Sequence, residues 1–210
     1  MREIELDLTG AWDVVIEKKQ ERIKKVSEKK IPKTKVLEEG GIYLPASIIS
    51  SMEILAQGVF RPNEEDIEVV YALSGMDALP DMVHQFSTEM VVSESSPVGM
   101  GTFVPNMLKC IASERGSSPE LLVQIHTHPG GSPKPSDLDL RFFRSTATMA
   151  KGYFPGVRVV FGIHAVTGGT PRERRKPQVK GNLVSWKSIT HDHGVGFYDE
   201  NGKRVNVVIT

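Results

Sequence analysis

Two apolar runs on either side of a helical segment constrain the fold of this chain most strongly. Leu121–His128 (LLVQIHTH) and Val157–Val166 (VRVVFGIHAV) are rich in β-branched residues and read as buried strands. The segment between them, from Asp137 to about Lys151, has the pattern of a helix. Strands that alternate with helices indicate an α/β or α+β fold with a mixed sheet.

The rest of the chain extends this pattern on both sides. We expect one domain over residues 41–210, with short strands and helices bounded by Gly- and Pro-containing turns. The expected elements are strands at Ile42–Leu44 and Ile67–Leu73, one or two strands within Met82–Glu94, helices from Pro45 to Ala56 and from Val104 to Ala112, and a terminal hairpin over Phe197–Ile209 around Asn201-Gly202.

Residues 1–40 are predicted to form a separate N-terminal basic helical extension. Its apolar residues fall on one helical face, and Pro32 ends the helix. Two interpretations stay open: a solvated helix docked by a thin apolar stripe, or an arm that binds a partner or nucleic acid. The stripe consists of Trp12, Val15, Ile16, Ile23 and Val26.

Composition excludes several classes of protein. The chain has 210 residues, a formal net charge of zero and a single cysteine, Cys110, which rules out a disulfide framework and an all-cysteine zinc site. No apolar run is long enough for a membrane span, and the N-terminus lacks a signal-peptide core. We therefore expect a cytoplasmic protein without a membrane partner, and the charge balance does not favour nucleic acid as a partner.

The neutral total conceals two basic segments. Residues 17–35 contain nine Lys or Arg and only three acidic residues, and a second cluster spans residues 172–180. Our hypothesis is that these segments dock a protein substrate with an acidic face.

The chemistry is concentrated in the stretch that begins with His126 and His128. Residues two apart in a strand share a face, so the two imidazoles can bind one Zn²⁺ ion. A Gly- and Pro-rich loop follows, and then Ser136-x-x-Asp139 opens the next helix, which brings a carboxylate near the strand end. Three protein ligands leave the fourth tetrahedral position to water, an arrangement typical of a catalytic zinc.

Each part of this pattern has a second interpretation. Ser136-x-x-Asp139 is also a capping box, in which both side chains satisfy backbone N–H groups at the start of a helix. A His-x-His pair alone is ambiguous. The capping role and the ligand role are compatible, and a catalytic zinc would need a further carboxylate to take the proton of the water and pass it to the leaving amine.

The segment His126-x-His128-Pro-x₆-Ser136-x-x-Asp139 resembles the signature of the JAMM (MPN+) metalloproteases, in their prokaryotic, deubiquitinase-like branch. The resemblance covers roughly residues 41–166. It implies the cytidine-deaminase-like JAMM/MPN fold, a mixed sheet sandwiched by helices, with zinc held by His126, His128 and Asp139. It also implies a zinc-dependent isopeptidase or peptidase that cleaves the amide after the C-terminal tail of a ubiquitin-like or sulfur-carrier protein.

The family also places a glutamate on an earlier strand, and Ile67–Gly75 resembles that segment. The resemblance makes Glu68 the general base and then acid, and gives Ser136 a hydrogen bond to the developing oxyanion or to the base. We expect Glu68 to be a carboxylate among apolar neighbours; Glu53 is the competing candidate. Tyr71 departs from the pattern, because the family usually has a small residue there.

Two other functions remain as alternatives: a non-catalytic MPN-type interaction scaffold, and a RadC-like DNA-associated protein, which the Gly/Pro-rich loop also resembles. Of the remaining histidines, we expect His164 to be a hydrogen-bonded core residue and His191-Asp192-His193 to form a surface turn. The sequence makes no prediction of the oligomeric state.

Overall fold

The computed structural model describes residues 40–57, 68–86, 97–168 and 173–210. These residues belong to one compact unit, Leu37–Thr210. The expected N-terminal extension, apart from Gly40, lies outside the described residues, and so does the basic segment 17–35.

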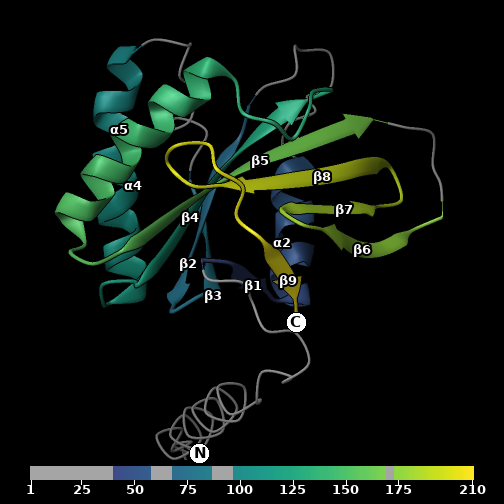
Figure 1. Ribbon diagram of the computed structural model, residues 1–210, viewed down its shortest axis with the longest axis horizontal. Helices are drawn as coiled ribbons and strands as arrows, with labels where there is room; N and C mark the ends of the chain where they lie inside the picture. Colours follow the sequence, from purple (N-terminus) through teal and green to yellow (C-terminus); the bar gives the residue numbers. More distant parts are fainter. Residues whose placement is uncertain (1–39, 58–67, 87–96, 169–172) are drawn as a thin grey trace, which may run out of the picture. The chain divides into compact units, whose positions relative to one another are not determined.

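A seven-stranded mixed sheet forms the centre of the unit (Figure 1). Its central strands β4 (Leu121–Pro129) and β5 (Arg158–Gly168) run parallel, and all other neighbours in the sheet are antiparallel. The strand order is β3-β2-β4-β5-β8-β7-β6, with β2 at Val70–Met76, β3 at Leu79–Gln85, β6 at Arg175–Lys180, β7 at Leu183–Lys187 and β8 at His191–Tyr198.

Helices cover both faces of this sheet. On one face, α4 (Pro97–Arg115) and α5 (Asp137–Tyr153) pack over a core that includes Phe143 and Phe161. On the other face, α2 (Ala46–Ala56) packs over a second core (Figure 1). The expected α/β architecture, a mixed sheet between helices, is confirmed.

The central strand–helix–strand unit, β4-α5-β5, follows the sequence prediction closely. The helix expected over Val104–Ala112 is α4, which begins earlier and ends where Gly116 adopts a φ of +70°. Within Met82–Glu94, the described part contains only the end of β3. The strand expected at Ile67–Leu73 is shifted, because β2 spans Val70–Met76. Glu68 therefore precedes the strand.

The expected C-terminal hairpin forms only next to its turn. The chain reverses at Gly202, where φ is +80°, and backbone hydrogen bonds join Asp199 to Lys203 and Val205 to Phe197 around the bridge between Tyr198 and Arg204. β9 (Val207–Ile209) instead pairs in parallel with β1 (Ile42–Leu44) to form a two-stranded sheet. The buried β1 needs a hydrogen-bonding partner, and this long-range pairing supplies one. The sequence analysis missed the hairpins β6-β7 and β7-β8.

Among the described residues, no helix combines the length and the apolar character that a membrane span requires.

Candidate metal centre

The end of β4 and the start of α5 bring three metal-ligating side chains together. His126 and His128 lie on β4, and Asp139 lies in the first turn of α5. The ligand atoms of these residues lie within 4.8 Å of one another, and they form the one group of this kind found among the described residues. The structure therefore assembles the three residues for which the sequence predicted a metal site.

The spacing of the ligand atoms can be compared with the edge of a zinc tetrahedron. Bonds of 2.0–2.1 Å to a tetrahedral ion separate neighbouring ligand atoms by about 3.3 Å. The Nε2 atoms of His126 and His128 are 3.1 Å apart. The Asp139 carboxylate approaches His126 Nε2 at 3.0 Å and His128 Nε2 at 3.6 Å. The donor set and its spacing therefore fit a zinc ion.

The loop after β4 fixes the orientation of His128. Gly130 adopts a φ of +62°, a conformation that favours glycine, and turns the chain back toward β4. His128 Nδ1 then lies 3.1 Å from the backbone carbonyl oxygen of Ser132. Since that carbonyl can only accept, Nδ1 carries the proton and the lone pair of Nε2 points toward Asp139.

Ser136 and Asp139 form the expected capping box. The Oγ of Ser136 accepts a hydrogen bond from the Asp139 backbone N–H at 3.2 Å, and Asp139 Oδ2 accepts one from the Ser136 N–H at 2.6 Å. The Ser136 hydroxyl also donates to Asp139 Oδ2 at 2.7 Å. The cap thus holds the carboxylate in position, and the capping and ligand roles are compatible as expected.

The surroundings of Asp139 favour its ionised form. Burial raises the pKa of this carboxyl. The hydrogen bond and charge of His126 and the hydrogen bonds from Ser136 lower the pKa by more than burial raises it, and they hold it well below its ordinary value. The carboxylate is therefore already deprotonated, as metal binding requires.

Glu68 lies next to this group in the backbone register. Val70 is directly opposite His126, and Val69 bonds to Thr127 through two hydrogen bonds, N–H to Oγ1 at 2.7 Å and carbonyl to N–H at 2.9 Å. Continuation of this antiparallel register places Glu68 opposite His128, on the sheet face of both histidines. The side chain is exposed, so the expectation of a carboxylate among apolar neighbours is wrong. The strand begins only at Val70, and Glu68 therefore stays outside the packed sheet.

Glu53, the competing candidate, belongs to the other face of the sheet. It lies in α2, and its carboxylate accepts hydrogen bonds from Trp186 Nε1 at 3.0 Å and from Arg174 Nη2 at 3.3 Å. Its role is therefore structural. Arg174, from the second basic segment, is committed to this ion pair.

Three aromatic side chains and Ser188 form a hydrogen-bonded chain on that same face. Ser188 donates its hydroxyl proton to the carbonyl of His191, so its Oγ accepts from His193 Nε2 at 3.3 Å. His193 Nδ1 then accepts from His164 Nε2 at 3.0 Å, and His164 Nδ1 accepts from the Tyr71 hydroxyl at 2.7 Å. The large residue at position 71 is thus explained by a buried partner.

Both histidines in this series of hydrogen bonds, His164 and His193, are held neutral. Burial lowers the pKa of His164 well below its ordinary value, with a further contribution from His193. Burial also lowers the pKa of His193 to about 4, and the neighbouring His191 adds to the effect, whereas Asp192 opposes it. The expected core role of His164 is confirmed. The expected surface turn at residues 191–193 is wrong, because the residues form the start of β8 and His193 is buried.

A Ser-His-Glu arrangement, which sequence spacing could not reveal, ties the end of α4 to β2 and β3. Ser74 Oγ lies 2.7 Å from His84 Nε2, and His84 Nδ1 contacts the Glu114 carboxylate. Arg115 donates to Ser74 Oγ at 3.1 Å and pairs with Asp81. The order of atoms resembles a hydrolase triad, but Ser74 and His84 are completely buried. A substrate cannot reach them, so the network is structural.

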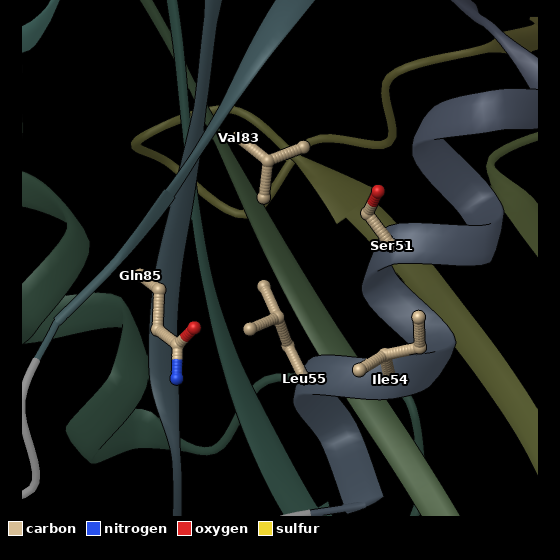
Figure 2. A pocket seen from close by; sticks show the side chains of 5 residues that line it. All are labelled: Ser51, Ile54, Leu55, Val83 and Gln85. Carbon is tan, nitrogen blue, oxygen red and sulfur yellow. The ribbon is translucent and has the colours of Figure 1, made fainter. Parts of the chain in front are cut away.

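A shallow apolar hollow lies between α2 and β3 (Figure 2). Its residues Leu55 and Val83 pack against the second core, so the hollow belongs to the sheet face opposite the metal ligands. Its lining contains no titratable side chain and therefore no metal ligand. The lining residues are Ser51, Ile54, Leu55, Val83 and Gln85.

A mixed sheet between helices, with two histidines at the end of a central strand and a carboxylate in the first turn of the next helix, fits the JAB/MPN class of proteins. That class includes both metalloproteases and non-catalytic members. The chain matches the family of prokaryotic homologs of the JAB domain over residues 32–186, and it belongs to this family. The family expected from the motif is thus confirmed.

Among solved structures, the chain is similar to a JAB1/MPN domain protein from Archaeoglobus fulgidus. The sequence identity is 12% and the TM-score is 0.37, over 81% of this chain and 98% of that chain. No curated protein sequence matches the chain.

Proposed function

We propose that this protein is a zinc-dependent isopeptidase or peptidase. It hydrolyses the amide bond after the C-terminal tail of a ubiquitin-like or sulfur-carrier protein. The observation that carries this proposal is the convergence of His126, His128 and Asp139 at the spacing of a zinc tetrahedron. Membership of a family that contains metalloproteases supports it.

The three ligands leave one side of the site accessible. His126 is 4% exposed, but the side chains of His128 and Asp139 are 18% and 14% exposed. A zinc ion held there supplies a Lewis acid that lowers the pKa of a water molecule and polarises the substrate carbonyl. The exposed side of the ligand group is where water and substrate would enter.

Glu68 is the residue that moves the proton. Continued by two residues beyond Val70, the register of β2 with β4 would put Glu68 on the same sheet face as the two histidines, one position beyond the backbone pair of Val69 and Thr127. Because the side chain is exposed, it can turn toward an incoming water, take its proton and deliver that proton to the leaving amine.

Ser136 has two proposed roles. In the capping box its hydroxyl proton points to Asp139 Oδ2, which supports a role in fixing the ligand. Its second role, a hydrogen bond to the developing oxyanion, requires the hydroxyl to rotate away from Asp139 while the backbone N–H of Ser136 keeps the carboxylate in place.

One edge of the sheet is a candidate binding site for the extended C-terminal tail of the substrate. β3 is the terminal strand of the sheet, and its residue Gln85 pairs with Tyr71, which in turn pairs with Ile125, the residue before His126. A tail that adds as a strand beside β3 would run toward the metal ligands. This arrangement supports a substrate with a flexible terminal tail.

The test is cleavage of purified isopeptide-linked conjugates of ubiquitin-like proteins, with and without a chelator. We expect cleavage by the wild-type protein, loss with the chelator, recovery with zinc, and loss in Glu68→Gln. Glu53→Gln is the matched control, because Glu53 lies on the other sheet face, and it should retain cleavage. Cleavage that survives chelation or the Glu68→Gln substitution would contradict the proposal.

The scaffold alternative makes a different prediction about metal content. A non-catalytic MPN-type module has no need of a complete ligand set, whereas here the two histidines and the aspartate are all present and close together. Protein purified without chelators should contain stoichiometric zinc if our proposal holds, and none if the chain is a scaffold.

A further inference from the structure

Three buried polar side chains, His126 and two residues behind it, have atoms without a hydrogen-bond partner among the described residues. These atoms are both amide atoms of Gln124, the Nδ1 of His126 and the hydroxyl of Thr146. Gln124 and Thr146 are completely buried, and His126 is 4% exposed. Buried polar groups in folded proteins are almost always hydrogen-bonded, so four such atoms in one region call for an explanation.

The three side chains lie in the same layer, between β4 and α5. Gln124 is two residues before His126 on β4, so both side chains point to the face that α5 covers. The ring of Phe143 on α5 is 6.3 Å from that of His126 and stacks at 4.2 Å on Phe161, the β5 neighbour of Gln124. The part of α5 that follows Asp139 therefore runs back along β4 from His126 toward Gln124.

Thr146 is on the buried side of this same helix. It follows Asp139 by seven residues, about 10 Å along the helix axis. Gln124 precedes His126 by two residues, about 7 Å along the strand. Because Asp139 contacts His126, these two steps bring Thr146 and Gln124 to a similar level of the sheet.

The donors and acceptors of the unpartnered atoms are complementary. A neutral histidine that binds a metal through Nε2 carries its proton on Nδ1 and needs an acceptor for it. For His128 that acceptor is the Ser132 carbonyl. For His126, the amide oxygen of Gln124 is an acceptor on the same face, and the amide nitrogen can donate in turn to the Thr146 hydroxyl.

We infer that Gln124 is the positioning residue of His126, and that Thr146 holds Gln124 in this role. No direct hydrogen bond joins these atoms. The Nδ1 proton of His126 therefore reaches the amide oxygen of Gln124 through a buried water molecule, and the amide nitrogen of Gln124 reaches Thr146 in the same way. This inference rests on the proposed function, because Gln124 can position His126 as a ligand only if His126 binds a metal.

Two substitutions separate this role from a role in folding. Gln124→Met and Thr146→Val preserve shape but remove the hydrogen-bonding atoms, whereas Thr146→Ser keeps the hydroxyl. The zinc dissociation constant is measured by competition with a chromophoric chelator, and the melting temperature is measured on the metal-free proteins. Gln178→Met, on the exposed edge strand β6, is the control for the same chemical change elsewhere.

We expect Gln124→Met and Thr146→Val to weaken zinc binding by about 10- to 100-fold. Thr146→Ser and Gln178→Met should bind zinc like the wild type. The metal-free Gln124→Met protein should melt near the wild-type temperature, because the hydrogen bonds of a buried amide contribute little beyond the cost of burying it. If a variant does not fold, the imidazole nitrogen NMR spectrum of the zinc-loaded wild type serves instead, and His126 should show a protonated, hydrogen-bonded Nδ1.

Three results would overturn the inference. The first is zinc affinity of Gln124→Met within twofold of the wild type, which leaves the proposed function intact. The second is a fall in the melting temperature of the metal-free variant, which makes Gln124 a structural residue. The third is a wild-type protein that binds no zinc, which removes the proposed function together with the inference.

Discussion

Two pairs of histidines lie on opposite faces of one sheet, and they differ in what their ring nitrogens contact. His126 and His128 point their Nε2 atoms toward each other and toward the Asp139 carboxylate at a partly exposed end of β4. His164 and His193 are buried on the other face, where each ring nitrogen has a hydrogen-bond partner.

The difference shows what makes a histidine pair available to a metal. In the buried pair, Tyr71 and Ser188 fix the tautomers, and every lone pair already accepts a hydrogen bond from a neighbour. In the pair at the metal site, the two Nε2 atoms converge with a carboxylate at a partly exposed position. Proximity of two imidazoles is common to both pairs, so the protein's own donors decide which pair is structural.

Asp139→Asn should have the largest effect, because it replaces the charged ligand of the metal site with a neutral amide. We expect zinc affinity to fall by more than about 100-fold, since even residues that only support a metal ligand contribute about 10- to 100-fold. Calorimetric titration of the metal-free protein measures this. Asp137→Asn, in the same helical turn but exposed, is the control and should bind zinc normally. Equal affinities in the two variants would contradict the assignment.

Acid should destabilise the folded protein through the buried histidine pair, in a defined pH range. The pKa of His193 is lowered to about 4 in the folded protein, and that of His164 is also lowered, whereas an unfolded histidine titrates near 6.5. The stability contributed by the neutral form is therefore complete above pH 6.5 and is lost as the pH falls toward 4.

For His193 this loss amounts to up to about 3 kcal/mol. Urea unfolding of the metal-free protein between pH 7 and pH 4 measures it, with His193→Phe as the comparison. The variant should lose less stability than the wild type over this range. The same loss in both proteins would show that other groups carry the pH dependence.

Tyr71→Phe should destabilise the fold and leave zinc binding unchanged. The substitution removes the donor to His164 Nδ1 and leaves a buried acceptor unsatisfied, which costs about 1–3 kcal/mol. Urea unfolding and zinc titration of the same variant separate the two effects. Tyr43→Phe, on the partly buried strand position of β1, is the control. A change in zinc affinity on Tyr71→Phe would mean that the two faces are coupled.

Arg174→Ala should have the smallest effect. It removes an ion pair whose arginine side chain is 61% exposed, and such pairs contribute about 1 kcal/mol or less. Glu53 keeps its hydrogen bond from Trp186, so the buried pair beneath stays intact. Unfolding experiments at low and high salt measure the change, and a larger loss of stability would mean that Arg174 organises the buried face.

The metal ligands could be predicted from the sequence because they depend on local rules. Two histidines that are two residues apart on a strand share a face, and Ser136-x-x-Asp139 marks the start of a helix. A short loop between this strand and this helix is then enough to bring the three ligands together. The identity of the family followed from the same residues.

The features that the sequence did not predict depend on long-range contacts. The pairing of β9 with β1, the burial of His193 and the partner of Tyr71 all join segments that are far apart in the chain. The position of Glu68 outside the packed sheet depends on where β2 begins, and a strand boundary is set by tertiary contacts more than by local pattern.

X-ray absorption spectroscopy of the zinc-loaded protein tests the central claim most directly. The account predicts one zinc per chain with a first shell of nitrogen and oxygen atoms at about 2.0–2.1 Å and the outer-shell scattering of two imidazoles. A sulfur atom in the first shell, scattering from fewer than two imidazoles, or protein that takes up no stoichiometric zinc would contradict the assignment of His126, His128 and Asp139 as the metal ligands.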